Sequence, residues 1–136
     1  MTEPLYEPQA SDTFIRDFLK QDDIRALFPG PYTTALNLPG DWTPDQDPHI
    51  GVFSDGGPFD FPIRTRDLIR ITVWARGKTP AQHFSHRALA VLLGRPIPGV
   101  GKVSDPTTVL YARDTDNDGI MGSFHLEAST RTKAIV

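Results

Sequence analysis

The sequence predicts an α+β fold, in which one domain contains a mostly antiparallel sheet of about four strands and two main helices packed on one face of that sheet. Apolar and polar residues alternate in 68–75 and again in 120–128, as in strands that bury one side. Apolar residues recur at helical spacing in 80–93. The expected elements follow one another as helix, strand, strand, helix, strand, strand, which is typical of helices covering an antiparallel sheet.

Composition limits the classes to which this chain can belong. Its 136 residues suffice for one domain with a modest core, and a hydrophobic fraction of 38% with 13 Pro and 11 Gly predicts long Pro- and Gly-rich loops. The formal net charge of −3 and the lack of a basic run give no footprint for nucleic acid binding. The absence of cysteine excludes disulfides, thiolate zinc sites and cysteine catalysis. No apolar run approaches the roughly 20 residues that a membrane helix needs, so we expect no membrane partner.

The N-terminal part is expected to contain an arm and a helix. Residues 1–10 are polar and contain two prolines, which is typical of a flexible arm. A helix is expected to begin at Ser11 or Asp12, and its apolar stripe loses phase near Gln21, which predicts a break followed by a second short turn. Pro29-Gly30-Pro31 ends this region.

The stretch from Asp67 to Gly94 predicts a half-buried strand that leads through a short turn into an amphipathic helix. The strand directs one set of residues to the core, namely Ile69, Ile71, Val73 and Ala75. Thr79 is the expected N-cap, so that Pro80 occupies the helix position that best tolerates proline. Gly94 and the proline that follows shortly after it stop the helix.

The remaining strands are expected on either side of this unit. A short strand is expected at 49–53, and the segments 107–113 and 120–128 form a β-hairpin. The domain therefore extends over 11–129, and residues 130–136 extend the last strand or form a C-terminal arm.

The segment Asp114-Thr-Asp-Asn-Asp-Gly119 matches the first half of an EF-hand calcium loop. The twelfth position of that loop is His125, where a bidentate Glu is required, and the flanking segments are strands instead of helices. Asp, Asn and Gly are also the residues that hairpin turns prefer, which favours a structural turn. No other pattern points to a nucleophile, a phosphate loop or a metal ligand set, so we expect no catalytic residue, no cofactor and no bound metal.

A different role is indicated by the loop Ser54–Arg66, which carries large apolar residues among turn residues. Aromatic and arginine side chains are common anchors of protein interfaces, and the candidate partner-binding residues are Phe59, Phe61, Ile63, Arg64, Arg66 and Trp74. Trp74 is included because it falls on the polar face of the central strand. The alternatives are that the loop residues pack locally beneath their own loop and that another segment covers Trp74.

The central stretch IRITVWARGKTPAQHFSHRALAVLLG resembles the strand–helix signature of tail terminator and tail-completion proteins of long-tailed bacteriophages. The resemblance lies in a strand of the type V-x-V-x-V-W-A followed by a helix with Ala and Leu periodicity, here Ile69, Ile71, Val73, Trp74, Ala75, Ala81, Phe84, Ala88 and Leu92. An N-terminal helix of the form F-x-x-x-F-L-K-x-D also fits, here Phe14, Phe18, Leu19, Lys20 and Asp22. The stretch from Pro29 to Pro48 is longer than this family leads one to expect.

The resemblance implies a structural virion protein that is not an enzyme. Such a protein assembles in the host cytoplasm into a homo-oligomeric ring, typically a hexamer, that caps the tail tube and joins it to the head-side connector. The implied partners are other copies of the chain, the tail tube protein and the connector or stopper protein, and DNA passes through the lumen without sequence-specific binding. The alternatives are a head–tail connector or stopper of the neck, a calcium-dependent binding module that uses residues 114–119, and a small enzyme with a site assembled from scattered residues.

Overall fold

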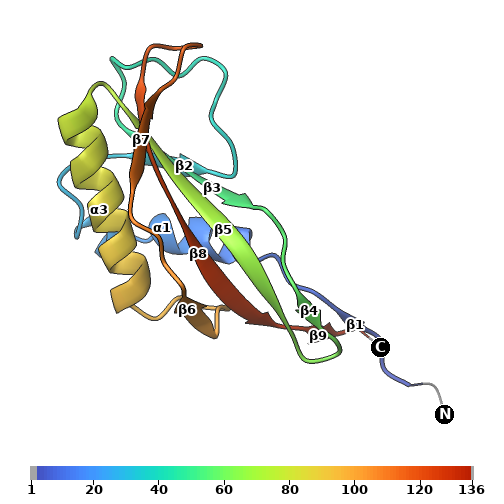
Figure 1. Cartoon of the computed structure of the whole chain (residues 1–136). Coiled ribbons are helices and arrows are strands. Elements are labelled where there is room, and N and C mark those ends of the chain that lie inside the picture. The colour runs from blue at the N-terminus through green and yellow to red at the C-terminus, as the bar shows by residue number, and fades with distance from the viewer. Residues whose placement is uncertain (1–2, 136) are drawn as a thin grey trace.

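The computed structural model describes residues 3–135 and contains one large sheet, one small sheet and three helices (Figure 1). The helices are α1 (Ser11–Leu19), α2 (Asp22–Arg25) and α3 (Lys78–Gly94). The large sheet contains β2 (Thr33–Ala35), β3 (His49–Ser54), β4 (Phe59–Asp60), β5 (Arg64–Ala75), β6 (Lys102–Ser104), β7 (Leu110–Arg113) and β8 (Ile120–Arg131). The small sheet pairs β1 (Tyr6–Glu7) with β9 (Lys133–Ala134).

The predicted fold class is wrong in the size and the pairing of the sheet. The large sheet has seven strands in place of about four, it is mixed because β2 and β3 are parallel, and α2 is a third helix. The strands that the sequence did not predict have two or three residues each, too few to display a period of two. β2, β4 and β6 form where backbone groups of β3, β5 and β8 are available for pairing, and β1 and β9 pair with each other, so all five depend on tertiary neighbours instead of local pattern.

The long elements were placed correctly, with shifted ends. The predicted hairpin is present as β7 paired with β8, and the predicted break in the first helix lies between α1 and α2. α3 begins two residues before Pro80, with Gly77 instead of Thr79 at the N-cap, so Pro80 lies in the first turn. β5 begins at Arg64, because residues 64–75 pair without interruption with 120–131 of β8.

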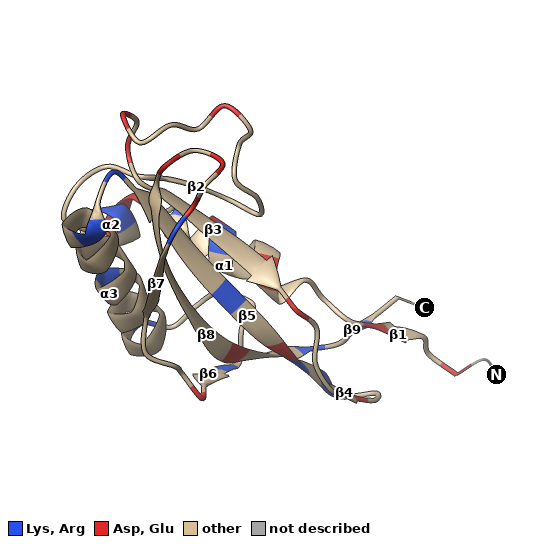
Figure 2. Cartoon of the chain, turned by 45° about the horizontal axis from the view of Figure 1, so that its top comes forward, with Lys and Arg blue, Asp and Glu red and all other residues tan. Residues whose placement is uncertain are grey.

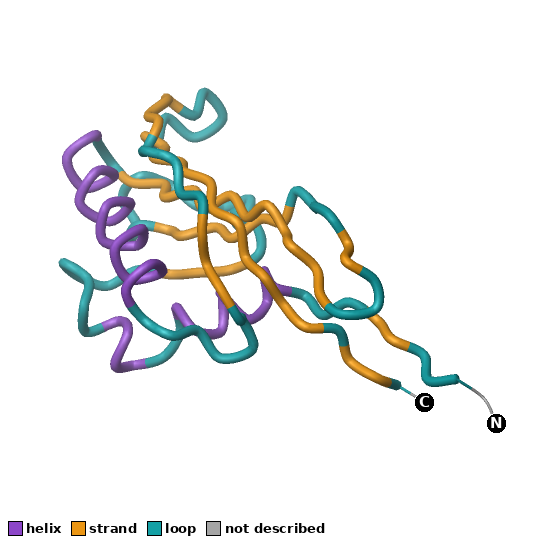
Figure 3. Tube along the Cα trace, turned by 60° about the horizontal axis from the view of Figure 1, so that its bottom comes forward, coloured by secondary structure: helices purple, strands orange, loops and turns teal. Residues whose placement is uncertain are grey.

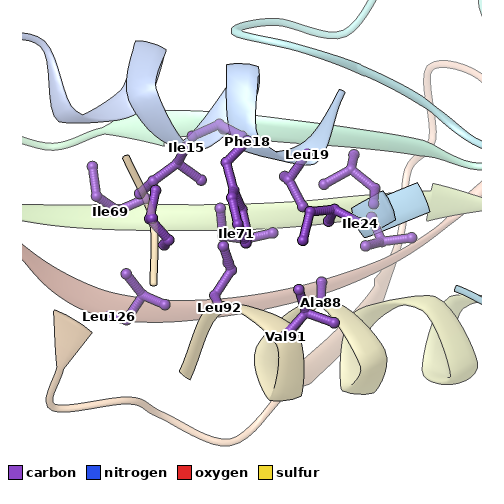
Figure 4. Close-up of a cluster of buried hydrophobic side chains, with 14 of the residues drawn as sticks. Ile15, Phe18, Leu19, Ile24, Ile69, Ile71, Ala88, Val91, Leu92 and Leu126 are labelled. Carbon is purple, nitrogen blue, oxygen red and sulfur yellow. The ribbon is translucent and has the colours of Figure 1, made fainter. Parts of the chain in front are cut away.

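The core lies between the sheet and helices α1 and α3, which cover one of its faces (Figure 4). Ile69, Ile71 and Val73 are fully buried there, as the alternation predicted. α1 contributes Ile15, Phe18 and Leu19, and α3 contributes Phe84, Ala88, Val91 and Leu92. No helix within residues 3–135 combines the length and the hydropathy required to cross a membrane.

The opposite face of β5 is covered at one end of the strand. Thr72 is only 1% exposed, although it points away from the helices. Its cross-strand neighbour is Gly51, and the rings of Phe53 and Trp74 lie so close to Gly51 that a Cβ there would be 2.7 Å from one ring and 2.8 Å from the other. The expectation of a strand buried on one side is therefore wrong at this end, because aromatic rings from two strands fold over the glycine.

Candidate interaction surface

A twisted ribbon of strands extends from the helical part of the molecule and carries both described ends of the chain (Figures 1 and 3). We define the arm as residues 5–7, 59–66 and 129–135, which form β1, β4, β9 and the adjoining ends of β5 and β8. Backbone hydrogen bonds join its segments: the Thr132 amide donates to the Ile63 carbonyl at 3.0 Å, and the Ile135 amide donates to the Leu5 carbonyl at 2.9 Å. The arm is therefore one hydrogen-bonded unit built from three distant parts of the sequence.

The tip of the arm exposes the apolar residues that the sequence analysis selected. The exposed fractions are 42% for Phe59, 71% for Phe61 and 67% for Ile63. The two phenylalanine rings contact each other edge to face, with centroids 5.8 Å apart. These side chains are not packed beneath their own loop, which was the alternative interpretation.

The arm also gathers exposed apolar residues that sequence reasoning did not select. Of the nine large hydrophobic residues that are exposed in the described chain, six lie on the arm: Leu5, Tyr6, Phe59, Phe61, Ile63 and Ile135. Three of them, Leu5, Tyr6 and Ile135, come from the terminal segments, where the sequence hinted at an interaction surface only by placing an apolar residue among polar ones. Exposed hydrophobic residues gathered in one region are typical of an interaction surface.

The two predicted arginines brace the turn at the tip through one carboxylate. Asp60 Oδ2 lies 3.0 Å from Arg66 Nε and 3.3 Å from Arg64 Nε. Hydrogen bonding from Arg66 is the main cause that lowers the pKa of Asp60. Arg64 and Arg66 therefore hold the conformation of the β4–β5 turn, and their side chains remain 48% and 37% exposed beside the apolar tip.

Trp74 does not join the other predicted residues. It lies ten positions from Arg64 along β5, which corresponds to about 30 Å of strand. Its side chain is only 6% exposed and its indole Nε1 donates to Asp114 Oδ2 at 3.0 Å. Trp74 therefore links β5 to the β7–β8 turn in this structure, as in the alternative that another segment covers it.

The β7–β8 turn, residues 114–119, is closed by its own side chains. Asp114 Oδ1 accepts from the Asp116 amide at 3.0 Å, and Asp114 Oδ2 accepts from both Trp74 Nε1 and Asn117 Nδ2. Asp118 has a positive φ of 63° and pairs with Arg113 at 2.7 Å. Within residues 3–135, no group of three or more His, Asp or Glu side chains is arranged to hold a metal ion. The carboxylates of Asp114 and Asp118 thus make the contacts of a hairpin turn.

A pocket of about 410 Å³ lies between this turn and the loop 38–47, at the other end of β5 from the arm. Its apolar lining comes from Leu38, Pro39 and Trp42, and its carboxylates come from Asp41, Asp114 and Asp116. Trp42 fixes the loop, since its indole Nε1 donates to the Asp47 carbonyl at 3.0 Å and its ring packs against Gly119. We call this the acidic pocket.

His49 anchors the base of the same loop. Its ring Nδ1 lies 2.7 Å from Thr33 Oγ1 and its Nε2 lies 2.6 Å from the Asn37 carbonyl, so a neutral ring with a proton on Nε2 satisfies both partners. Burial lowers the pKa of His49. The folded state therefore favours the neutral imidazole.

No protein-family model matches the chain, and no curated protein shows significant similarity to it. The arm and the acidic pocket are the surface features of the described residues that bear on function, together with the resemblance of the sequence to tail terminator proteins.

Proposed function

We propose that this protein is a structural component of a bacteriophage virion, a tail terminator that forms a ring at the head-proximal end of the tail tube. The observation that carries the proposal is the arm, which concentrates on one projecting ribbon six of the nine large hydrophobic residues that are exposed within residues 3–135. An apolar patch of this kind would reduce the solubility of a chain that acted alone, whereas in an oligomer it is covered.

The proposed partners are those that the family resemblance implies. They are further copies of the chain in a ring, typically a hexamer, the tail tube protein on one side and the connector or stopper protein on the other. The ring has a structural role, and DNA passes through its lumen without sequence-specific contacts.

The function is tested in a phage whose copy of this gene carries a nonsense codon. We expect heads and tails to accumulate without joining, and the wild-type protein supplied in trans to restore plaques. Phe61→Ser/Ile63→Ser should fail to restore them, because the interface loses its anchors, while the isolated variant keeps the wild-type circular dichroism spectrum. Leu110→Ser is the matched control: this residue is 77% exposed but lies outside the arm, so we expect full complementation.

Localisation separates the terminator from the head–tail connector. A terminator copurifies with tails from a mutant that makes no heads and is absent from tailless heads. The opposite distribution would assign the chain to the connector or stopper, and its absence from both particles would refute a virion role.

A further inference from the structure

The arm and the acidic pocket have opposite charge. The arm contains four basic residues and two acidic residues: Arg64, Arg66, Arg131 and Lys133, compared with Glu7 and Asp60. Residues 38–47 and 114–119 contain six aspartates and neither Lys nor Arg. Figure 2 shows Asp and Glu on the loops at one end, with an Arg on the adjoining β7, and both signs of charge on the arm at the other end. The two ends are therefore electrostatically complementary.

Exposed charged groups at each end are available for a partner. Arg131 and Lys133 form no ion pair with any residue in 3–135. The same holds for Asp41 and Asp116 on the pocket. Complementary charges left unpaired within one copy can pair between two copies.

The arm and the acidic pocket also carry apolar side chains that could pack against each other. The arm presents Phe61 as its most exposed aromatic side chain, and the pocket presents Leu38 and Pro39 beside the indole of Trp42, which is itself only 4% exposed. Aromatic pairs and desolvated apolar anchors contribute most of the affinity at protein interfaces, and flanking charges mainly set orientation and association rate.

We propose that the arm of one copy docks in the acidic pocket of the next copy, with Phe61 against Leu38 and Pro39 and the arm cations facing the aspartates of the pocket. This inference deepens the proposed ring and rests on it. Because the two surfaces lie at opposite ends of one molecule, the contact is heterologous: every copy gives one arm and receives another, so the chain of contacts closes into a ring when the rotation permits.

Cysteine cross-linking tests the contact directly, since the natural chain contains no cysteine. Full-length Ile63→Cys and Asp116→Cys are mixed at high concentration and treated with a short bismaleimide. We expect a dimer that contains one copy of each variant and nothing larger. The double variant Ile63→Cys/Asp116→Cys should instead give a ladder of multimers, because each copy then reacts at both ends.

The matched control replaces the pocket cysteine with one on an exposed position of α3, Gln82→Cys. Cross-linking to Ile63→Cys should be lower by at least about tenfold in this mixture. Charge reversal supplies a second readout: Arg131→Glu should weaken the arm–pocket cross-link to a similar extent, and Asp41→Arg in the pocket partner should restore it.

The outcomes distinguish this contact from the virion role. Efficient cross-linking of Ile63→Cys with itself would overturn the proposal, because the arm would then meet another arm, and equal reaction with Gln82→Cys would overturn it as non-specific. If the protein is located on tails but the arm and the pocket do not cross-link in those tails, the ring role stands and the contact is refuted. If the ladder forms but the protein is absent from virions, the contact stands and the proposed function is refuted.

Discussion

Gly119 provides a sharp test of how the loop 38–47 is held against the β7–β8 turn. A Cβ at this position would lie 2.7 Å from one ring carbon of Trp42 and 3.0 Å from another, which is closer than carbon atoms approach in proteins. We therefore expect Gly119→Ala to push the indole out of place. The Trp42 side chain is buried and its Nε1 is hydrogen bonded, so the ring cannot move without loss of packing.

The expected cost follows from the price of overpacking, about 1–3 kcal/mol. For 136 residues with an entropy of unfolding of about 2.1 cal/mol/K per residue, a loss of about 2 kcal/mol lowers the Tm by about 7 °C. Gly40→Ala is the matched control, because Gly40 lies in the same loop with nothing within 4 Å of its Cβ position. We expect that substitution to change the free energy of unfolding by less than about 1 kcal/mol.

Thermal denaturation followed by circular dichroism measures both variants, and an ¹H–¹⁵N spectrum reports the two indole N–H groups separately. Gly119→Ala should lower the Tm and shift the Trp42 indole resonance, whereas Gly40→Ala should do neither. If the two variants have the same Tm and the Trp42 resonance stays in place, the loop does not pack on the turn and the acidic pocket is not formed as described.

Three further predictions concern the sheet, pH and calcium. In urea denaturation, Thr72→Asp and Val73→Asp should each lower the free energy of unfolding by about 3–5 kcal/mol, because both faces of β5 are covered at this end. Leu68→Asp, at a half-exposed position of the same strand, should lower it by less than about 1 kcal/mol. A similarly small effect of Thr72→Asp would refute the cover of the sheet face opposite the helices. Burial lowers the pKa of His49 in the folded state, so as the pH falls below about 6.5 the unfolded chain takes up the proton first. The free energy of unfolding should therefore decrease by up to about 1.4 kcal/mol per pH unit in this range. The same pH dependence of stability in His49→Gln would contradict the assignment of this effect to His49. Calorimetric titration should show no calcium binding at low-micromolar affinity, and a one-site isotherm that disappears in Asp116→Ala would overturn the assignment of 114–119 as a structural turn.

Sequence pattern alone located the elements that are long enough to show a period. The alternation in β5 and β8 and the apolar stripe of α3 identified those elements and the residues that they direct into the core between sheet and helices, because side-chain direction in a long strand or helix is set by local geometry. The exposed tip at Phe59, Phe61 and Ile63 was also identified from sequence, since large apolar residues among turn residues have few local partners.

The tertiary structure decided what depends on segments distant in the chain. The parallel pairing of β2 with β3 and the joining of β1 to β9 are set by which backbone edges remain available, and strands of two or three residues carry no pattern that specifies such a partner. The burial of Trp74 required the glycine at position 51, the ring of Phe53 and the carboxylate of Asp114, none of which is its neighbour in sequence. The arm and the acidic pocket are each assembled from segments that are distant in sequence, and the antiparallel pairing of β5 with β8 places the two surfaces at opposite ends of one ribbon. The sequence could not predict this arrangement, because separation along the chain does not determine the distance between two surfaces in space.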